Sequence, residues 1–407
     1  MQHRSTAPSG DDWLGEPPTI SDDMAASELF ADVVVVGCGI AGVAAVRSAA
    51  EEGATVVAIE KAAGPQCRSS QFALMGGKLQ ERWGRTDVDP DLVIDHEMDE
   101  GSYFPKRAIW SKWAREGADV FDWYVEALEG IMIGDTHIDD VPDDTTAVLP
   151  MYHPQPEGYD WRTETHPCFP LSAWIIPAEQ PGLDANMQKA VDTGNVTALW
   201  GHFAEKLVME GGRCTGVYAR DAETGGYVKV NAAKGVVLAT GDYGSNAAMV
   251  AHFCPDVAAN GIFCLWPNFD VEGNPTNTGD GLKLGVWAGA LVQQHHAPMI
   301  HHMGGGNGVL MGTLGISPYL RLDLNGKRFM NEDCPGQQTE NQIEHLKGKK
   351  CYMFWDADRN VIGGLYVAGN VQGDRFAVQY PIALKGASHS MTLYYGYVAG
   401  KNAVAEV

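Results

Sequence analysis

The sequence lacks the features that mark several protein classes. Its 407 residues contain no apolar run long enough to cross a membrane, so membrane insertion is not expected. Lysine and arginine number only 29 against 52 aspartates and glutamates, and the formal net charge of −23 argues against nucleic acid as a partner. None of the eight cysteines stands in a C-x-x-C pair. Neither a zinc nor an iron–sulfur framework is therefore indicated, and no metal site is predicted.

The N-terminal segment also lacks an apolar core. Residues 1–29 are polar and contain prolines and paired aspartates, which predicts a flexible N-terminal arm and not a signal peptide. The cytoplasm is therefore the expected location. Hydrophobic residues make up 45% of the chain, whose length favours two globular domains.

What the sequence does contain is a dinucleotide-binding pattern. Four consecutive valines at 33–36 predict a buried strand. Gly37, Gly39 and Gly42 follow with the spacing G-x-G-x-x-G. In such a motif the first glycine permits a tight turn, the second lets the backbone approach a pyrophosphate, and the third lets the next helix pack closely on the sheet. The N–H groups at the start of that helix would face the phosphates.

An acidic residue stands where this pattern requires one. A second apolar strand is predicted over residues 54–59, and Glu60 ends it, 18 residues after Gly42. An acid at this distance accepts hydrogen bonds from a ribose diol. The alternative is a glycine-rich turn in an ordinary α/β domain, but the order of strand, helix, strand and acid favours dinucleotide binding.

The middle of the chain predicts helices and then a β-excursion. The aromatic residues between 91 and 130 recur at helical spacing and are interpreted as core. Residues 134–170 show little periodicity and are interpreted as irregular surface. Strands are predicted over residues 196–200, 216–220, 226–230 and 235–240. The last of these runs into the sequence Ala-Thr-Gly, which resembles the segment that returns to the flavin in two-dinucleotide-type flavoproteins, and the alternative is an ordinary strand end.

Residues 251–360 differ in character and are predicted to form a second, inserted domain. The segment contains two histidine doublets within His295–His302, for which metal binding, substrate contact and plain surface or core all stay open. The absence of acids or cysteines at ligand spacing argues against a metal there. Asn325-Gly326 predicts the turn of a hairpin, with Arg328 directly after it.

The order of these motifs resembles the flavoprotein subunits of the fumarate reductase and succinate dehydrogenase family, in the soluble branch that includes urocanate reductases. The resemblance rests on GxGxxG with Glu60, then ATGDYGSN, TGDGLKLGVWAGA, NGKRFMNE, GGLYVAGNVQGD and GASHSMTLYYGYVAGKNA. It implies an α/β fold: a Rossmann-like FAD-binding domain whose parallel sheet carries a β-excursion, with an inserted, truncated α+β capping domain. The FAD-binding domain would comprise 30–250 and 361–407, and the capping domain 251–360.

The resemblance also implies a cofactor, a reaction and a set of site residues. FAD would be the cofactor, and an activated C=C bond of a small unsaturated organic substrate would be reduced with electrons from an unidentified donor. The residues expected to bind FAD are Gly37, Gly39, Ile40, Ala41, Gly42, Glu60, Lys61, Ser69, Ser70, Gly76, Gly77, Thr240, Gly241, Asp280, Asn370, Ser388 and Ser390. The residues expected to act on the substrate are Arg328, His301, His302 and His389.

Two departures from the family pattern leave alternatives open. A Thr-Glu pair that helps bind a dicarboxylate in the family is replaced by residues 315–320, GISPYL, so a substrate other than fumarate is expected. The chain also joins abruptly at residues 355–361, where the family continues its capping domain. The alternatives are therefore a flavin-binding remnant without turnover and a dehydrogenase of ketosteroid type.

Overall fold

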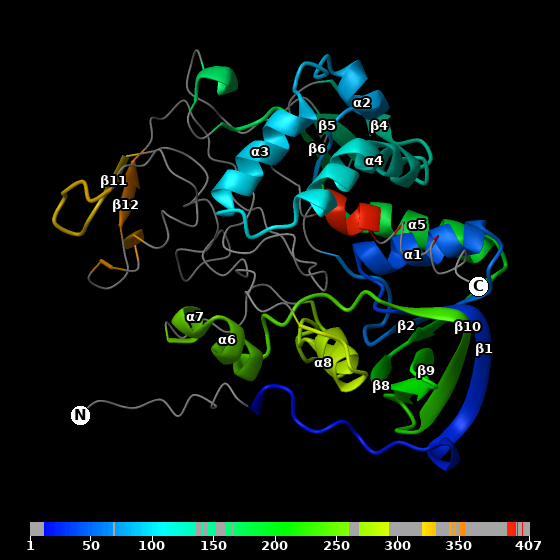
Figure 1. Cartoon of the computed structure of the whole chain (residues 1–407). Helices are drawn as coiled ribbons and strands as arrows, with labels where there is room; N and C mark the ends of the chain where they lie inside the picture. Colours follow the sequence, from blue (N-terminus) through cyan, green and yellow to red (C-terminus); the bar gives the residue numbers. More distant parts are fainter. Residues whose placement is uncertain are drawn as a thin grey trace, which may run out of the picture.

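The computed structural model of this chain describes most of its residues, which form three sheets and the helices around them (Figure 1). The described residues are 12–67, 70–135, 141, 145–150, 159–164, 167–259, 268–292, 320–330, 342–343, 345–346, 351–354, 389–395, 397 and 401. Every structural statement below refers to these residues.

A six-stranded sheet forms the centre of the fold, in the order β7-β2-β1-β10-β9-β8. Its strands are β1 (Ala25–Val36), β2 (Val56–Glu60), β7 (Val196–Trp200), β8 (His202–Glu210), β9 (Arg213–Asp221) and β10 (Tyr227–Leu238). The four strands from β7 to β10 run parallel, whereas β10, β9 and β8 form an antiparallel meander. This is the predicted parallel sheet with a β-excursion.

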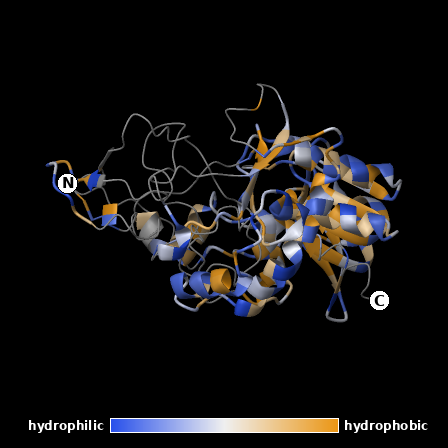
Figure 2. Cartoon of the chain, turned by 90° about the horizontal axis from the view of Figure 1, so that it is seen from above, coloured by the Kyte–Doolittle hydropathy of each residue, from blue (hydrophilic) through white to orange (hydrophobic). Residues whose placement is uncertain are grey.

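Two helices, α1 (Ile40–Glu51) and α5 (Gln180–Asp192), pack on one face of this sheet. Helix α4 (Arg107–Val125) packs on α5, and α2 (Gly77–Arg82) and α3 (Pro90–Glu100) pack on α4. Alanines and glycine give α1 a narrow cross-section, so it packs closely on β1 and α5. Figure 2 shows hydrophobic residues concentrated on the strands, while the helices alternate between hydrophobic and hydrophilic faces. The aromatic residues of α4 lie in the core, as predicted.

A second, four-stranded sheet was not predicted from the sequence. It has the order β3-β6-β5-β4, with β3 (Gln71–Ala73), β4 (Met132–Ile133), β5 (Ala147–Pro150) and β6 (Ser172–Ile176). The strands are only two to five residues long, and all four residues of β5 are buried. Such short strands give no alternating pattern, and two of them lie at the edges of or within 134–170, which we interpreted as irregular surface.

Five further elements follow β10. They are the helices α6 (Ala247–Phe253), α7 (Pro255–Ala259) and α8 (Asp280–Trp287) and the strands β11 (Leu320–Leu322) and β12 (Tyr352–Phe354), which pair in a two-stranded sheet. Two 3₁₀ turns, at Asp22–Met24 and Trp161–Thr163, precede β10. The turn predicted at Asn325-Gly326 is present, because Gly326 has a φ of +74° and its N–H donates to Asp323 O at 3.0 Å.

Two predicted boundaries differ from the structure. The arm predicted over residues 1–29 includes the first five residues of β1, and Ile20 is buried. The side chains of these five residues are mostly exposed, and their backbone pairs with β10. The strands predicted at 226–230 and 235–240 are one strand, since β1 runs beside the polar residues that separate them.

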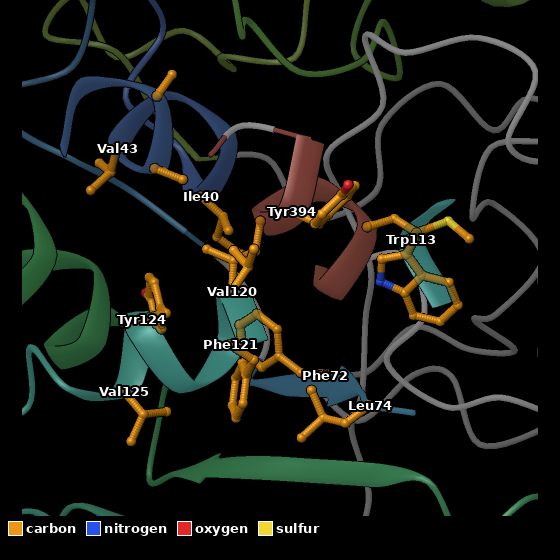
Figure 3. Packing of buried hydrophobic residues seen from close by; sticks show 14 of the residues in the cluster. Ile40, Val43, Phe72, Leu74, Trp113, Val120, Phe121, Tyr124, Val125 and Tyr394 are labelled. Atoms are coloured by element: carbon orange, nitrogen blue, oxygen red, sulfur yellow. The ribbon is translucent and has the colours of Figure 1, made fainter. Parts of the chain in front are cut away.

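The C-terminal part of the chain returns to the first helix. Residues 389–395 are helical, and the Ser48 hydroxyl of α1 donates to Tyr397 O at 2.9 Å. Tyr395 donates to Ile109 O of α4 at 2.6 Å. Figure 3 shows Tyr394 beside Ile40 of α1 and Val120 of α4. The tail of the chain therefore shares one hydrophobic core with the helix of the glycine motif.

One buried arginine connects three helices. Arg47 of α1 donates to Trp123 O at 2.9 Å and to Asn186 Oδ1 of α5 at 2.6 Å. Its Nε atom lies 2.7 Å from Glu51, and its guanidinium stacks 3.9 Å from the centre of the Trp123 ring. Because Arg47 is only 3% exposed, these partners replace the water that the charge loses on folding.

Replacing Arg47 is expected to destabilise the fold. Arg47→Leu would leave the carbonyl of Trp123 and the amide of Asn186 without their donor, and we expect the free energy of unfolding to fall by about 2–3 kcal/mol. Urea denaturation measures this change. Arg115→Leu is the control, because Arg115 of α4 is 59% exposed and its loss should change stability by no more than about 0.5 kcal/mol. Equal effects of the two substitutions would contradict the assignment.

Candidate dinucleotide site

The glycine turn between β1 and α1 packs directly against the end of β10. Gly37 has a φ of +91°, and a Cβ on it would lie 2.5 Å from Ala239 O. A Cβ on Gly42 would lie 1.7 Å from Gly37 O. Neither position can hold a side chain, so both glycines are required for the turn itself.

Gly39 differs from its two neighbours in the motif. Its φ of −75° is open to any residue, and a Cβ there would meet only Gln66 O, at 3.7 Å. The fold therefore does not need glycine at this position. A ligand that approaches the backbone would need it, because Gly39 is the N-cap of α1 and the next residues, Ile40 and Ala41, begin the helix.

Glu60 lies at the same turn, at the end of β2. Its Oε2 atom accepts a hydrogen bond from Cys38 N at 2.7 Å, and its Oε1 atom accepts one from Ala62 N at 2.8 Å. Desolvation raises the pKa of Glu60, although the two N–H donors and the Lys61 ammonium act in the opposite direction. Each carboxylate oxygen keeps a lone pair for a further donor such as a ribose hydroxyl.

A polar cluster joins the end of β2 to the start of α8. The ammonium of Lys61 lies 2.7 Å from Asp280 Oδ2 and donates to Thr278 Oγ1 at 2.9 Å. Thr278 also donates to Asp280 Oδ1 at 2.8 Å. The structure thus brings together two of the predicted residues, Lys61 and Asp280, and adds Thr278, which the sequence analysis did not select although it lies in the quoted TGDG stretch.

The segment after β10 lies against the same cluster. Gly281 N donates to Thr240 Oγ1 at 2.9 Å, and Gly241 has a φ of +77°. Val271 N donates to Lys61 O at 3.1 Å. Part of the predicted insert 251–360 therefore contacts the dinucleotide-binding sheet, and the division of the chain at residue 250 remains a prediction.

Three predicted residues lie in or near the second sheet. Ser70 is buried, and its hydroxyl accepts a hydrogen bond from Trp174 Nε1. Gly76 and Gly77 both have φ values above +80°. A Cβ on Gly77 would lie 2.8 Å from Ala118 Cβ, whereas nothing lies within 4 Å of one on Gly76. Gly77 is therefore explained by helix packing, and Gly76 by its backbone conformation.

The candidate substrate residues are spread over two parts of the fold. His389 and Ser390 are buried at the start of the C-terminal helical segment, and the ring centre of His389 lies 5.9 Å from that of Phe72. Arg328 follows the hairpin turn and bridges to Leu322. Arg321 on β11 is buried, which the sequence did not indicate. No described contact joins Arg328 to Glu60 or His389.

Some predictions fall outside the described residues. These are the FAD-binding expectations for Ser69, Asn370 and Ser388, the substrate expectations for His301 and His302, and the junction at residues 355–361. They stay predictions. Within the described part of the chain, no group of three or more histidine, cysteine or acidic side chains is placed to hold a metal ion. In that same part, every helix is too short or too polar to span a membrane.

Comparison with known proteins identifies the family. Residues 32–361 match the model of the FAD binding domain family. This chain belongs to that family. FAD is its cofactor, and the predicted α/β fold with a Rossmann-like FAD-binding domain is confirmed.

The FAD-binding chain is similar to reductases of unsaturated compounds. It is 23% identical over 367 residues to a fumarate reductase (cytochrome) of Shewanella frigidimarina, covering 84% of this chain and 54% of the relative. It is 25% identical over 359 residues to a vinyl phenol reductase of Lactiplantibacillus plantarum, covering 83% of this chain and 65% of the relative. The chain thus spans between half and two thirds of the length of these relatives.

The fold of the FAD-binding chain is also that of a solved flavoprotein. It superimposes on the open conformation of a flavocytochrome c3 fumarate reductase with a TM-score of 0.61 at 17% identity, covering 94% of this chain and 79% of the other. The residues present fit FAD, because Gly39 leaves space for a pyrophosphate at the start of α1 and Glu60 presents acceptors to a ribose. The Lys61–Asp280 pair lies directly beside Glu60.

Alanine substitutions should separate the roles of Gly39 and Gly42. Gly39→Ala is expected to fold normally and to bind FAD about 10- to 100-fold more weakly, because the new methyl group occupies the space for the pyrophosphate. Gly42→Ala is expected to prevent folding of the turn, since its Cβ would overlap Gly37 O. Flavin fluorescence titration and circular dichroism measure the two effects. Tight FAD binding by Gly39→Ala would contradict the assignment.

FAD affinity is expected to depend on pH through Glu60. An ionised carboxylate accepts hydrogen bonds from ribose more strongly than a protonated carboxyl group does, and desolvation raises the pKa of Glu60 above its ordinary value. Binding therefore releases a proton, and the dissociation constant should fall as pH rises through the raised pKa. Isothermal titration between pH 5 and pH 8 tests this, with Glu60→Gln as the control that should lose the dependence.

Proposed function

We propose that the chain is an FAD-dependent oxidoreductase that reduces an activated C=C bond of a small organic substrate. The observation that carries the proposal is the packing of the C-terminal helical segment on α1 and Phe72, which places the buried His389 in the same core as the glycine turn. The similarity to a fumarate reductase and a vinyl phenol reductase supports the same reaction type.

The reaction assigns two tasks to the side chains. When bound and reduced by the external donor, the FAD would supply a hydride for one alkene carbon. The chain must then deliver a proton to the other carbon and stabilise the negative charge that develops on the electron-withdrawing group. In this proposal His389 delivers or relays the proton, and Arg328, His301 and His302 hold the electron-withdrawing group. An external donor restores the reduced cofactor.

The proposed substrate is less charged or bulkier than fumarate. A dicarboxylate requires hydrogen-bond donors or cations at both ends. The stretch 315–320, GISPYL, contains the hydroxyl groups of one serine and one tyrosine and no charged side chain. An alkene with one activating group, such as an enoate or a vinyl phenol, matches that composition better.

Anaerobic reoxidation of the reduced protein tests the proposal. The FAD-loaded protein is reduced with dithionite and mixed with fumarate, a set of enoates and a vinyl phenol, and the flavin absorbance is followed. We expect one of the singly activated alkenes to reoxidise the flavin at least about tenfold faster than free reduced FAD and faster than fumarate does. His389→Gln should reduce this rate by about 100-fold, as expected for loss of a group that moves a proton.

The control substitution is His252→Gln. His252 is an exposed residue of α6, its ring centre lies 5.6 Å from that of Trp13, and it is not among the residues assigned to FAD or the substrate. It should leave the rate unchanged. If no alkene reoxidises the protein faster than free FAD, the alternative of a flavin-binding chain without turnover holds in its place.

A further inference from the structure

The loop after Glu60 is held from the side by the first residue of α5. Gln180 Nε2 donates to Pro65 O at 3.0 Å, and Cys67 N donates to Gln180 Oε1 at 3.3 Å. One side-chain amide thus binds the backbone on both sides of Gln66. Because it uses a donor and an acceptor together, it fixes the orientation of this loop as well as its distance from α5.

The amide of Gln180 is itself held in place. Its Nε2 atom also donates to Asp184 Oδ1 at 2.8 Å, one turn further along α5. The carboxylate of Asp184 can accept a hydrogen bond only from the NH₂ group of the amide. The NH₂ group therefore faces Pro65 O, and the amide oxygen faces Cys67 N. Helix α5 packs on α1, which begins at the glycine turn. The contacts of Gln180 therefore fix the position of the loop relative to α1.

The residue between the two held positions borders the space above Gly39. Gln66 O is the atom that lies 3.7 Å from the position of a Cβ on Gly39. A carbonyl oxygen would repel the pyrophosphate if the loop moved inward. The position of Gln66 O therefore determines the space available to an anionic ligand beside Gly39 and the partial negative charge close to it.

We infer that Gln180 is a positioning residue for FAD, whose side-chain amide fixes the loop 65–67 so that Gln66 O stays clear of the pyrophosphate. The inference rests on FAD binding and not on the proposed reduction of an alkene. Gln180 acts through the loop, in which the Sγ atom of Cys67 also lies 3.7 Å from Gln180 Oε1.

The same helix provides a matched control. Gln188 Nε2 donates to Asp192 Oδ1 at 2.7 Å, so α5 contains a second glutamine–aspartate pair with the same spacing. That pair lies on an exposed part of the helix. Gln188→Ala therefore removes the intrahelical bond alone, whereas Gln180→Ala removes both that bond and the contacts with the loop.

The experiment compares FAD binding and apo-protein stability in the two variants. Flavin fluorescence titration of full-length apo-protein should show about tenfold weaker binding for Gln180→Ala, as expected for losing two loop hydrogen bonds, and a change below about twofold for Gln188→Ala. The thermal unfolding midpoints of the two apo-variants should agree. Binding by Gln180→Ala within twofold of the unsubstituted protein overturns the inference, and so does a midpoint well below that of Gln188→Ala.

A second variant, Gln180→Glu, tests the same contacts without shortening the side chain. Gln180→Glu keeps an acceptor for Cys67 N but turns a carboxylate toward Pro65 O and Asp184, so binding should be at least as weak as in Gln180→Ala. Binding of FAD as tight as in the unsubstituted protein would overturn the role of the amide. The titrations contain no substrate or reductant, so their outcome is independent of whether the chain reduces any alkene.

Discussion

The close approach of two backbone segments at the glycine turn is the constraint on which the rest of the structure depends. Gly42 lies so near Gly37 O that no side chain fits, and a Cβ on Gly37 would lie only 2.5 Å from Ala239 O, directly after β10. Helix α1 can therefore start directly at the edge of the sheet. Its position fixes α5, the C-terminal helical segment and, through Arg47, the aromatic helix α4.

The parts of the site that could be predicted from the sequence are those with a fixed spacing along the chain. The turn glycines and Glu60 follow such a spacing, whereas the return of the strand before Thr240 is predicted from the family resemblance, and the structure places these parts together. The contacts of Gln180 and Thr278 could not be predicted in the same way. Gln180 is 113 residues from Cys67 and Thr278 is 217 residues from Lys61, and no local pattern links partners that are so far apart.

The second sheet shows a different limit of sequence reasoning. A strand such as β5 is buried on every residue and only four residues long, so its sequence has no period that separates it from a short piece of helix or loop. Its pairing with β6 is what makes it a strand. The first five residues of β1 show the converse case, because they continue a polar N-terminal segment and are mostly exposed, whereas their backbone pairs with β10.

The buried carboxylate of Glu60 explains why the turn should bind a diol, whose two hydroxyl groups donate hydrogen bonds. Desolvation raises the pKa of Glu60, so removing water from this carboxylate is unfavourable even with two N–H donors in place. Lys61 offsets the charge only in part, because its ammonium is shared with Asp280 and Thr278. Two ribose hydroxyls would supply the donors that the folded chain does not. The same carboxylate that opposes folding at neutral pH thereby favours the bound state, which couples the stability of the turn to its occupancy.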